Sequence, residues 1–481
     1  MPKTVRVVWT PQESPFGGRR SRVPYSYDAY VPDPVAGWDA AVPPSLAAEI
    51  ADADRALLSS STVVSLAGME AISRYLLRAE CIASSRIEGL VISHRRIAEV
   101  AFDPAHADES ARSVLGNIDA MERAIRIAAR PGRLTAADLV AMHRALFAVT
   151  RDAAIAGVVR TTQNWIGGRS DGPAGAEFVP PPPGLVPGLL DDLAEFCSRD
   201  DLPAVLQAAV AHAQFETIHP FPDGTGRVGR CLVHVVLRRA GHAGPFVPPV
   251  SLALAGDAKA YVKGLGDFRR GDAAAWIGLF TAATRLAADH SREFAELARA
   301  TTARWMDEAR ARAGTALARA IQALPECPVL DAARLATTVR CDPATAHAVL
   351  ARLTAAGIVT ESTLGRRNRV FVARGCLELL NEFERSLLDR TGVRSRMRAP
   401  RRAPTRPPRA EVAPAESLVL RRLADGPLAL ADVRGRTGLP PRRLQSILAR
   451  LRRRGLVRLT GRARTAQWSL TAAGRSAAQE A

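Results

Sequence analysis

From about residue 46 to residue 319, apolar side chains recur at spacings of three and four, which is the periodicity of helices with one buried face. One such stripe joins Ile72, Leu76, Ala79 and Ala83, and another begins at Leu202 and runs to Ile218. Helices of this kind bury their apolar faces against one another, so the pattern predicts a mainly α fold. With 481 residues, 47% of them hydrophobic, the chain is long enough for several domains.

One stretch interrupts the helical pattern. Between residues 160 and 183 the sequence passes through Asn164, Trp165, Ile166 and Gly167, then a glycine-rich turn, and ends in four consecutive prolines. Short apolar runs on either side of a glycine-rich turn are typical of a β-hairpin. We therefore expect a hairpin flap that leaves the helical body.

The first 60 residues form a separate region in this interpretation. Up to about residue 45 they are rich in proline and aromatic residues, and prolines at this density exclude a single helix. Large rings favour contact with a surface over exposure to water. We expect this segment to wrap over a domain.

An internal repeat occupies the C-terminal third. Residues 348–359 align without gaps with residues 446–457, which lie 98 positions later. Two shorter amphipathic segments precede each copy, and a hairpin pattern follows it at 365–367 and at 461–464. This order predicts two winged helix-turn-helix (α+β) domains, at 311–393 and 415–475, joined by an Arg/Pro-rich linker at 394–414.

The net charge of +18 is concentrated near the C-terminus. Residues 395–481 contain 20 arginines and 5 acidic residues, a net +15, and such a segment is typical of nucleic-acid binding. Compositional bias is the alternative, because the whole chain has 63 arginines and only 3 lysines; bias does not explain why acidic residues thin out only here. The long helix of the second unit favours DNA as a partner through its arginines, Arg442, Arg443, Arg450, Arg452, Arg453 and Arg454. A protein-interaction role stays open for both units.

No run of residues approaches the ~18 apolar positions that a membrane span needs, and the first residues lack the apolar core of a signal peptide. We expect a cytoplasmic protein without a membrane partner. The six cysteines are scattered, with no spacing that suggests a disulfide framework or a zinc site.

The segment from His219 to Arg230, His-Pro-Phe-Pro-Asp-Gly-Thr-Gly-Arg-Val-Gly-Arg, carries the most chemical information. Its two prolines must end the helix that reaches Ile218, and a new helix can begin near Gly226. Gly224, Thr225 and Gly226 then offer backbone N–H groups at a helix N-terminus, which is a site for an anion.

Side chains around this anion site complete a set of parts. Arg227 and Arg230 can contact phosphates, and Asp223 can hold a Mg²⁺ that bridges phosphate oxygens. His219 can accept a proton near neutral pH. Each of these features alone is weak evidence; a histidine before a proline, for example, is more often structural. Their presence together in one short segment favours transfer of a hydroxyl onto a nucleotide phosphate.

This segment closely resembles the signature of the Fic (Fic/Doc) family, H-x-F-x-D/E-G-N-G-R-x-x-R, with Thr225 in place of the usual asparagine. The resemblance extends from about residue 46 to residue 319 and includes the expected flap. It implies a helical Fic fold and transfer of AMP from ATP to a Ser, Thr or Tyr hydroxyl of a target protein. In that pattern His219 is the general base, Asp223 binds Mg²⁺, and the cofactor-binding residues are Gly224, Thr225, Gly226, Arg227 and Arg230.

Upstream, Ser84-Ser85-Arg86-Ile87-Glu88-Gly89 resembles the inhibitory motif of the same family, S/T-x-x-x-E-G/N. The Glu88 carboxylate can pair with Arg230 in the space that the γ-phosphate needs, with Ser84 as the other motif residue. A solvated glutamate near a helix end is the alternative. This interpretation predicts a helical region with the inhibitory motif at 61–112 and a Fic catalytic domain at 113–310.

Together these observations predict a protein adenylyltransferase that is autoinhibited by Glu88, uses ATP and Mg²⁺, and docks its target on the flap residues 164–167. A DNA-binding transcriptional regulator, whose Fic domain only senses nucleotide because of Thr225, is the alternative. The intact His219, Asp223 and Arg230 favour the enzyme.

Overall fold

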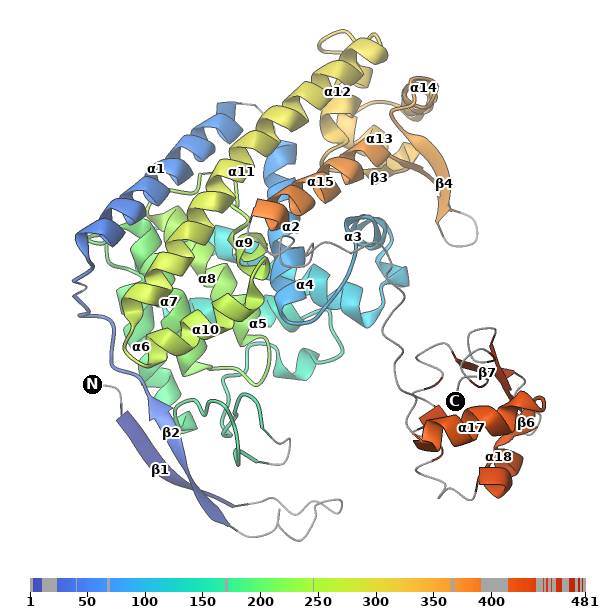
Figure 1. Ribbon diagram of the computed structural model, residues 1–481. Coiled ribbons are helices and arrows are strands. Elements are labelled where there is room, and N and C mark those ends of the chain that lie inside the picture. Colours follow the sequence, from blue (N-terminus) through green and yellow to red (C-terminus); the bar gives the residue numbers. More distant parts are fainter. Residues whose placement is uncertain are drawn as a thin grey trace. The chain divides into compact units, whose positions relative to one another are not determined.

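The computed structural model describes residues 3–10, 24–39, 41–66, 70–168, 172–244, 246–364, 368–390 and 414–437, and short stretches between 444 and 478. The chain divides into two compact units, unit 1 at residues 1–397 and unit 2 at residues 398–481. Helices dominate and the sheets are small and antiparallel, which confirms the mainly α prediction (Figure 1). No helix in the described ranges is long and apolar enough to cross a membrane.

Unit 1 is organised around α7 (Ala204–Ile218), in which every residue is buried. Its predicted apolar stripe is buried, but so is its opposite face, because five helices contact it. The polar side chains of His212, Gln214 and Glu216 are therefore enclosed as well. The surrounding helices are α1 (Pro44–Leu66), α6 (Val186–Phe196), α8 (Thr225–Arg239), α10 (Ala258–Arg269) and α11 (Ala273–Glu308).

A second group of helices lies beside α8 and holds the upstream motif. Helix α2 (Glu70–Ile87) contacts α4, α8 and α9, and its predicted stripe from Ile72 to Ala83 is fully buried. The group consists of α2, α3 (His94–Phe102), α4 (Glu109–Ala128), α5 (Ala136–Phe147) and α9 (Val250–Ala255), with short 3₁₀ turns η2 (Pro104–His106), η3 (Ala153–Ile155) and η4 (Pro183–Leu185).

The N-terminal region contains a hairpin that the sequence analysis did not predict. Strands β1 (Lys3–Trp9) and β2 (Tyr25–Val31) are antiparallel, with Lys3 opposite Val31 and Trp9 opposite Tyr25. Both strands are rich in β-branched or aromatic residues, which alternate with polar ones at 5–7 and 25–28, and the prolines that dominated the prediction lie outside the strands. The following residues lie on the helical body, where Val35 N–H donates to Asp192. Helix α1 begins at Pro44, so the wrapping segment is shorter than the predicted 60 residues.

The expected flap hairpin is reduced to a single antiparallel bridge between Ile166 and Phe178 among the described residues. The prolines at 180–183 have no N–H to donate to a ladder, and the side chains of Gln163 and Asn164 bond to backbone carbonyls nearby. The prediction of a two-stranded hairpin was wrong in this respect. Tyr30 N–H of β2 donates to Val179 O, so the N-terminal hairpin lies beside the flap.

The first copy of the repeat forms part of unit 1, and we call residues 316–372 the first module. Its sheet has the order β3-β5-β4, and helix α15 (Arg374–Arg390) follows it. One hydrophobic core continues from the helical body into this module, across the boundary predicted at residue 310. The elements are α12 (Ala316–Ala323), β3 (Val329–Leu330), α13 (Ala332–Val339), α14 (Pro343–Ala355), β4 (Thr360–Leu364) and β5 (Asn368–Val372).

The second copy lies in unit 2, and we call residues 414–470 the second module. It has its own core, with Val419, Leu448 and Leu451 among its members, and its sheet has the order β6-β8-β7. The linker at 394–413 and the six arginines singled out in its long helix lie outside the described residues. The described elements are α17 (Pro414–Ala424), β6 (Leu428–Ala429), α18 (Leu430–Thr437), β7 (Val457–Thr460) and β8 (Gln467–Leu470).

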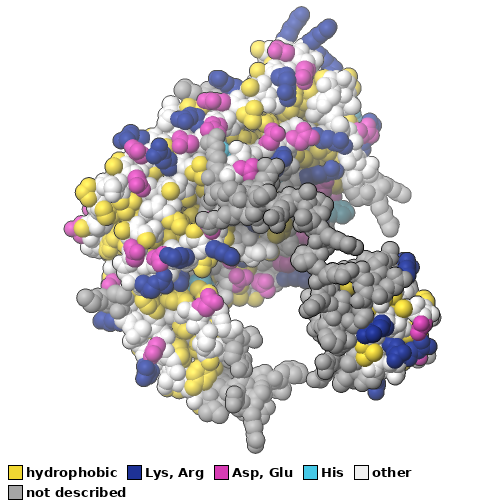
Figure 2. Space-filling model, viewed as in Figure 1, with side chains coloured by type: hydrophobic (Ala, Val, Ile, Leu, Met, Phe, Trp, Pro, Cys, Tyr) yellow, Lys and Arg dark blue, Asp and Glu magenta, His cyan; other side chains and the backbone are white. Residues whose placement is uncertain are grey.

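The surface of unit 1 mixes charges of both signs. On the face shown in Figure 2, basic and acidic side chains of this unit are interspersed. Many are paired, as Arg95 is with Glu99 and Lys263 with Asp267. The excess positive charge of the sequence therefore belongs to the C-terminal segment that follows unit 1's described residues.

Candidate functional site

The loop from His219 to Gly224 joins α7 to α8. Helix α7 ends at Ile218, and His219 adopts the left-handed conformation with φ 48° and ψ 63°, which is uncommon for a residue with a side chain. Gly224, with φ 75°, precedes the first residue of α8, and a side chain there would collide with Leu146 and Phe147. The helix end and the new helix start that the sequence predicted are therefore present, and a histidine in a strained conformation follows the end of α7.

Arg160, which begins the flap segment, is hydrogen-bonded to backbone carbonyls of this loop. Its Nε donates to His219 O at 2.7 Å and its Nη2 to Pro181 O at 2.6 Å, while its backbone N–H donates to Pro220 O. The side chain is buried, and burial lowers the pKa of Arg160 to about 10. Arg160 thus ties the flap and the loop together through backbone carbonyls.

His143 on α5 supports the other end of the loop. Its ring stacks on Phe221 with centroids 3.9 Å apart, and both side chains are fully buried. Nδ1 accepts the N–H of Gly157, so Nε2 carries the proton and donates to Asp223 O at 3.0 Å. Burial lowers the pKa of His143 to about 4, so it stays neutral near pH 7.

His219 itself remains partly exposed at the surface of the loop. Burial lowers the pKa of its imidazole to about 4, so the ring is neutral near pH 7. A neutral imidazole can accept a proton from a hydroxyl that reaches it.

The residues expected to form the anion cradle lie at the start of α8. Thr225 and Gly226 occupy its first two positions, where backbone N–H groups have no partner within the helix. Thr225 is buried, and within the described structure its hydroxyl has no hydrogen-bond partner. A side chain at Gly226 would collide with Oε1 of Glu88, so glycine permits that carboxylate to approach the helix.

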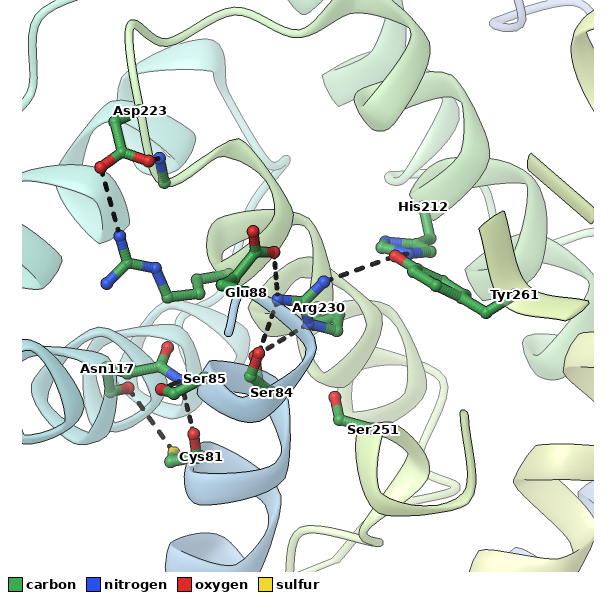
Figure 3. A network of polar contacts seen from close by, with 12 residues as sticks. Cys81, Ser84, Ser85, Glu88, Asn117, His212, Asp223, Arg230, Ser251 and Tyr261 are labelled. Atoms are coloured by element: carbon green, nitrogen blue, oxygen red, sulfur yellow. Dashed lines mark hydrogen bonds and ion pairs between the residues drawn. The ribbon is translucent and has the colours of Figure 1, made fainter. Parts of the chain in front are cut away.

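Arg230 is the centre of the polar network in Figure 3. Its side chain is 2% exposed, and Nη2 donates to Glu88 Oε1 at 2.7 Å and to Ser84 O at 2.9 Å. Nε donates to Ser84 Oγ at 2.8 Å, and Nη1 lies 3.4 Å from the Tyr261 hydroxyl, which contacts His212. The structure therefore brings Ser84, Glu88 and Arg230 together, as the inhibitory motif implied.

The electrostatics of this pair favour the charged forms. Burial alone would raise the pKa of Glu88, but the Arg230 guanidinium and its hydrogen bond outweigh burial and lower it. Burial alone would lower the pKa of Arg230, yet Tyr261, Glu88 and Glu216 together raise it. A buried guanidinium paired with a carboxylate in this way is a charge-assisted contact.

Arg227 turns to a different side of α8. Its Nη1 donates to Ser113 Oγ on α4 at 2.7 Å, and its guanidinium lies over the Phe147 ring at 5.3 Å from the centroid. The two arginines therefore line the loop from different sides.

Asp223 is the candidate metal ligand. Its carboxylate is 66% exposed; Oδ1 accepts the N–H of Gly224 at 2.6 Å and Oδ2 lies 3.7 Å from Arg227 Nη2. No group of three or more His, Cys, Asp or Glu side chains in the described ranges could hold a metal alone. Mg²⁺ commonly binds through one or two carboxylates, with phosphate oxygens and water completing its shell, so Asp223 fits an ion that arrives with a nucleotide.

The four flap residues have different environments. The Asn164 amide donates to Phe221 O at 3.2 Å, so this side chain supports the loop. The Trp165 ring meets Trp9 of β1 edge-on, with centroids 5.3 Å apart. Ile166 forms the bridge to Phe178, and Gly167 has φ 74°, which favours glycine.

Sequence reasoning missed the residues that hold the site from outside the motif. Arg160, His143 and Tyr261 lie 59, 80 and 31 positions from the residues they contact here, so no local pattern links them to the loop. Glu216 near the end of α7 is a further such residue; it is buried, and its Oε1 has no hydrogen-bond partner within the described structure. Its place in an apolar helix was the one available signal.

Comparisons with known proteins agree with this site. The model of the Fic/DOC family matches residues 133–237, and that of the Fic/DOC family N-terminal region matches residues 47–126. Protein adenylyltransferase fic-1 of Caenorhabditis briggsae is 32% identical over 135 residues, which are 27% of this chain and 24% of that protein. A probable protein adenylyltransferase of Aquifex aeolicus is 43% identical over 68 residues, or 14% of this chain and 21% of that protein.

The chain thus spans about a quarter of the length of these curated relatives. Among solved structures, a Fic family protein from Desulfovibrio desulfuricans has a TM-score of 0.44 and 18% identity, covering 69% of this chain and 97% of that one. The two family matches contain the upstream motif, the loop and both arginines. Residues 47–126 and 133–237 are thus similar to the two regions of the Fic/DOC family.

Proposed function

We propose that this chain transfers AMP from ATP to the hydroxyl of a Ser, Thr or Tyr residue in a target protein, and that Glu88 holds the reaction off. The observation that carries the proposal is the 2.7 Å pair between Glu88 and Arg230, formed beside Gly226 at the N-terminus of α8. A helix N-terminus with a buried arginine favours an anion, and here the anion is part of the chain. Relatives that are named protein adenylyltransferases support this reaction class.

His219 acts as the general base. Its neutral ring takes the proton of the target hydroxyl as that oxygen attacks the α-phosphorus of ATP. The new oxygen–phosphorus bond forms while the bond to the β-phosphate bridging oxygen breaks, so AMP is transferred and pyrophosphate leaves. Arg160 and His143 keep the loop in the shape that presents His219.

The start of α8 binds the phosphates. The backbone N–H groups of Thr225 and Gly226 would bind the transferred phosphate, and that of Gly224 would join them on leaving Asp223 Oδ1. Arg227 and Arg230 would contact the outer phosphates. Asp223 would hold Mg²⁺, which when bound offsets phosphate charge. Thr225 supplies a hydroxyl where the family has an amide, so it offers the cradle one donor fewer than asparagine would.

Glu88 inhibits by occupying Arg230. While the carboxylate is paired, the guanidinium is not free for the γ-phosphate, and like charges disfavour a phosphate beside Glu88. The flap residues Trp165, Ile166 and Gly167 dock the target as an extended segment through main-chain bonds.

The decisive experiment is incubation of the Glu88→Gly chain with α-labelled ATP and Mg²⁺, in the presence and absence of a cell lysate. We expect labelled adducts on the chain or on lysate proteins, and little labelling with the unaltered chain. Glu88→Gly combined with His219→Ala is the matched control and should remain unlabelled. Absence of label from Glu88→Gly in both settings would refute the proposed transfer.

A second function concerns the second module. Its elements follow the helix, strand, helix, hairpin order of a winged helix, and residues 395–481 carry a net +15. These two observations support DNA binding by this module. If Glu88→Gly proves inactive while DNA binding depends on ATP, the chain is a nucleotide-sensing regulator and not an enzyme.

A further inference from the structure

One carboxylate from the C-terminal part of unit 1 contacts both ends of the segment that carries Glu88. Glu384 on α15 accepts a hydrogen bond from Arg86 Nη2 through Oε2 at 3.0 Å, and its Oε1 lies 2.7 Å from His94 Nε2. The Glu384 and His94 side chains are only 10% and 4% exposed. Arg86 and Glu384 are 298 positions apart in the sequence.

The two partners of Glu384 lie on either side of Glu88 in the sequence. Arg86 lies in the last turn of α2, two residues before Glu88, and His94 is the first residue of α3. Between them the chain turns at Gly89, with φ 84°. Glu384 therefore fixes both ends of the turn from which Glu88 reaches Arg230, and the turn cannot move away from α8 as a body without breaking one of these contacts.

Burial opposes the charged form of Glu384, and its two partners offset that cost. Burial alone would raise the pKa of Glu384, but His94 and Arg86 outweigh burial and lower it. Removing one partner from a buried charged contact leaves the others without compensation and is much more costly than losing an exposed pair. Loss of the Glu384 charge would therefore weaken the attachment of both ends of the turn.

The first module adds a second attachment to the same helix. Glu326, between α12 and β3, pairs with Arg74 of α2 at 3.1 Å through its carboxylate, and its carbonyl accepts Arg78 Nη1 at 2.9 Å. Helix α2 is thus held near its start by Glu326 and at its end by Glu384. Glu326 precedes the first module's sheet in the sequence and Glu384 follows it, and both contact α2, the helix that ends in the inhibitory motif.

We infer that Glu384 is a positioning residue for Glu88: by holding Arg86 and His94 it keeps the inhibitory carboxylate against Arg230. The inference rests on the proposed function, and it deepens it by assigning the control of inhibition to the first module and α15. A ligand or partner that shifts α15 would release Glu88 without touching the ATP site.

The test compares Glu384→Gln with Glu382→Gln in the full chain. Glu382 is an exposed residue of the same helix, two positions away, and provides the matched control. Hydrogen exchange of peptides that span residues 86–94 is measured first, because it does not depend on activity. We expect exchange at least about tenfold faster in Glu384→Gln, and no change in Glu382→Gln.

AMP transfer is measured in the same variants and in Glu88→Gly. Glu384→Gln should show transfer above the unaltered chain and below Glu88→Gly, and adding Glu384→Gln to Glu88→Gly should give no further gain. Faster exchange with no transfer in any variant, Glu88→Gly included, would support the positioning role and refute the proposed reaction. Unchanged exchange and unchanged transfer in Glu384→Gln would overturn the inference.

Arg86→Gln tests the same contact if Glu384→Gln does not fold. Arg86→Gln removes one of the two contacts and leaves the buried contact between His94 and Glu384, so it should fold and show a smaller rise in both measurements. If Glu384→Gln is unfolded, an Arg86→Gln chain that behaves as the unaltered chain in both measurements overturns the inference, and a rise in both supports it.

Discussion

The described elements of the second module follow the order of their counterparts in the first, but the hydrophobic cores of the two modules differ. Helix α13 spans residues 332–339 and α18 spans 430–437, a shift of 98 positions at both ends, the offset of the sequence repeat. The first module shares one core with the helical body, whereas the second has a core of its own. A repeated fold therefore does not imply a repeated role.

Single residues explain much of this difference. Glu326, which pairs with Arg74 of α2, has Ala424 at the equivalent position 98 residues later. In the second module the surface arginines Arg434 and Arg436 on α18 are exposed. The first module thus contacts a neighbouring helix, whereas the exposed arginines of the second module support the proposed binding of a negatively charged partner.

The largest effect should come from the catalytic base, and it should leave the second module untouched. His219→Ala in the Glu88→Gly chain should lower AMP transfer by roughly 10²- to 10⁴-fold, the usual contribution of a general base. ATP affinity should be nearly unchanged, because the imidazole acts on the hydroxyl. Transfer rates and nucleotide binding are measured together, and an equal loss of both would show that His219 has another role.

The second largest effect concerns the second module alone. Binding of the full chain to a short DNA duplex of random sequence should weaken by roughly 10²-fold between about 50 and 200 mM salt, if about four phosphates are contacted. Arg434→Gln should reduce the salt slope by about one. A chain that ends at residue 393 should not bind. Equal binding by the shortened chain would assign the nucleic-acid contact to unit 1 and reverse the comparison.

Local features of the sequence predicted the backbone geometry of the loop between α7 and α8. Pro220 and Pro222 fix where α7 ends, and Gly224 and Gly226 allow α8 to start close to Glu88, so the motif encodes its own geometry. The Glu88 pair was predictable only through the family resemblance. The buried contact of Glu384 was not predictable, because no periodicity connects residues 298 positions apart.

Two features of the fold were hidden for other reasons. In the N-terminal region, prolines that lie between and after the strands masked the alternation within β1 and β2. In the flap, the prolines at 180–183 have no backbone N–H to donate, so the described residues form one bridge and not a longer ladder. The register of a strand depends on the strand that pairs with it, and the pattern within one segment does not identify that partner.

A smaller effect on AMP transfer should distinguish the first module from the second. Glu326→Gln weakens a pair whose arginine is 48% exposed, so it should raise transfer only about two- to fivefold, as for other surface pairs. Removal of residues 394–481 from the chain with Glu88 intact, the background of Glu326→Gln, should leave transfer within about twofold. Activation by this truncation that exceeds the effect of Glu326→Gln would mean that the second module, and not the first, restrains the enzyme.

The smallest effect is the pH response, which should belong wholly to unit 1. With its pKa lowered to about 4 by burial, His219 is already neutral at pH 6, so the general base contributes no change in rate between pH 6 and pH 8. Below that range the rate should fall as the ring takes up a proton. A midpoint near 6.5 would show that the imidazole is not shielded from water during the reaction.

A weak residual response near neutrality should come from Glu216, which lies beside Gly229 and close to Arg230. Burial raises the pKa of Glu216 to about 7, so raising the pH from 6 to 8 ionises it and adds a negative charge near the phosphate arginine. The KM for ATP of the Glu88→Gly chain should therefore rise about two- to threefold over this interval, with kcat nearly constant. Glu216→Gln should remove the rise, and the chain ending at residue 393 should retain it, because every group involved lies on α7 and α8.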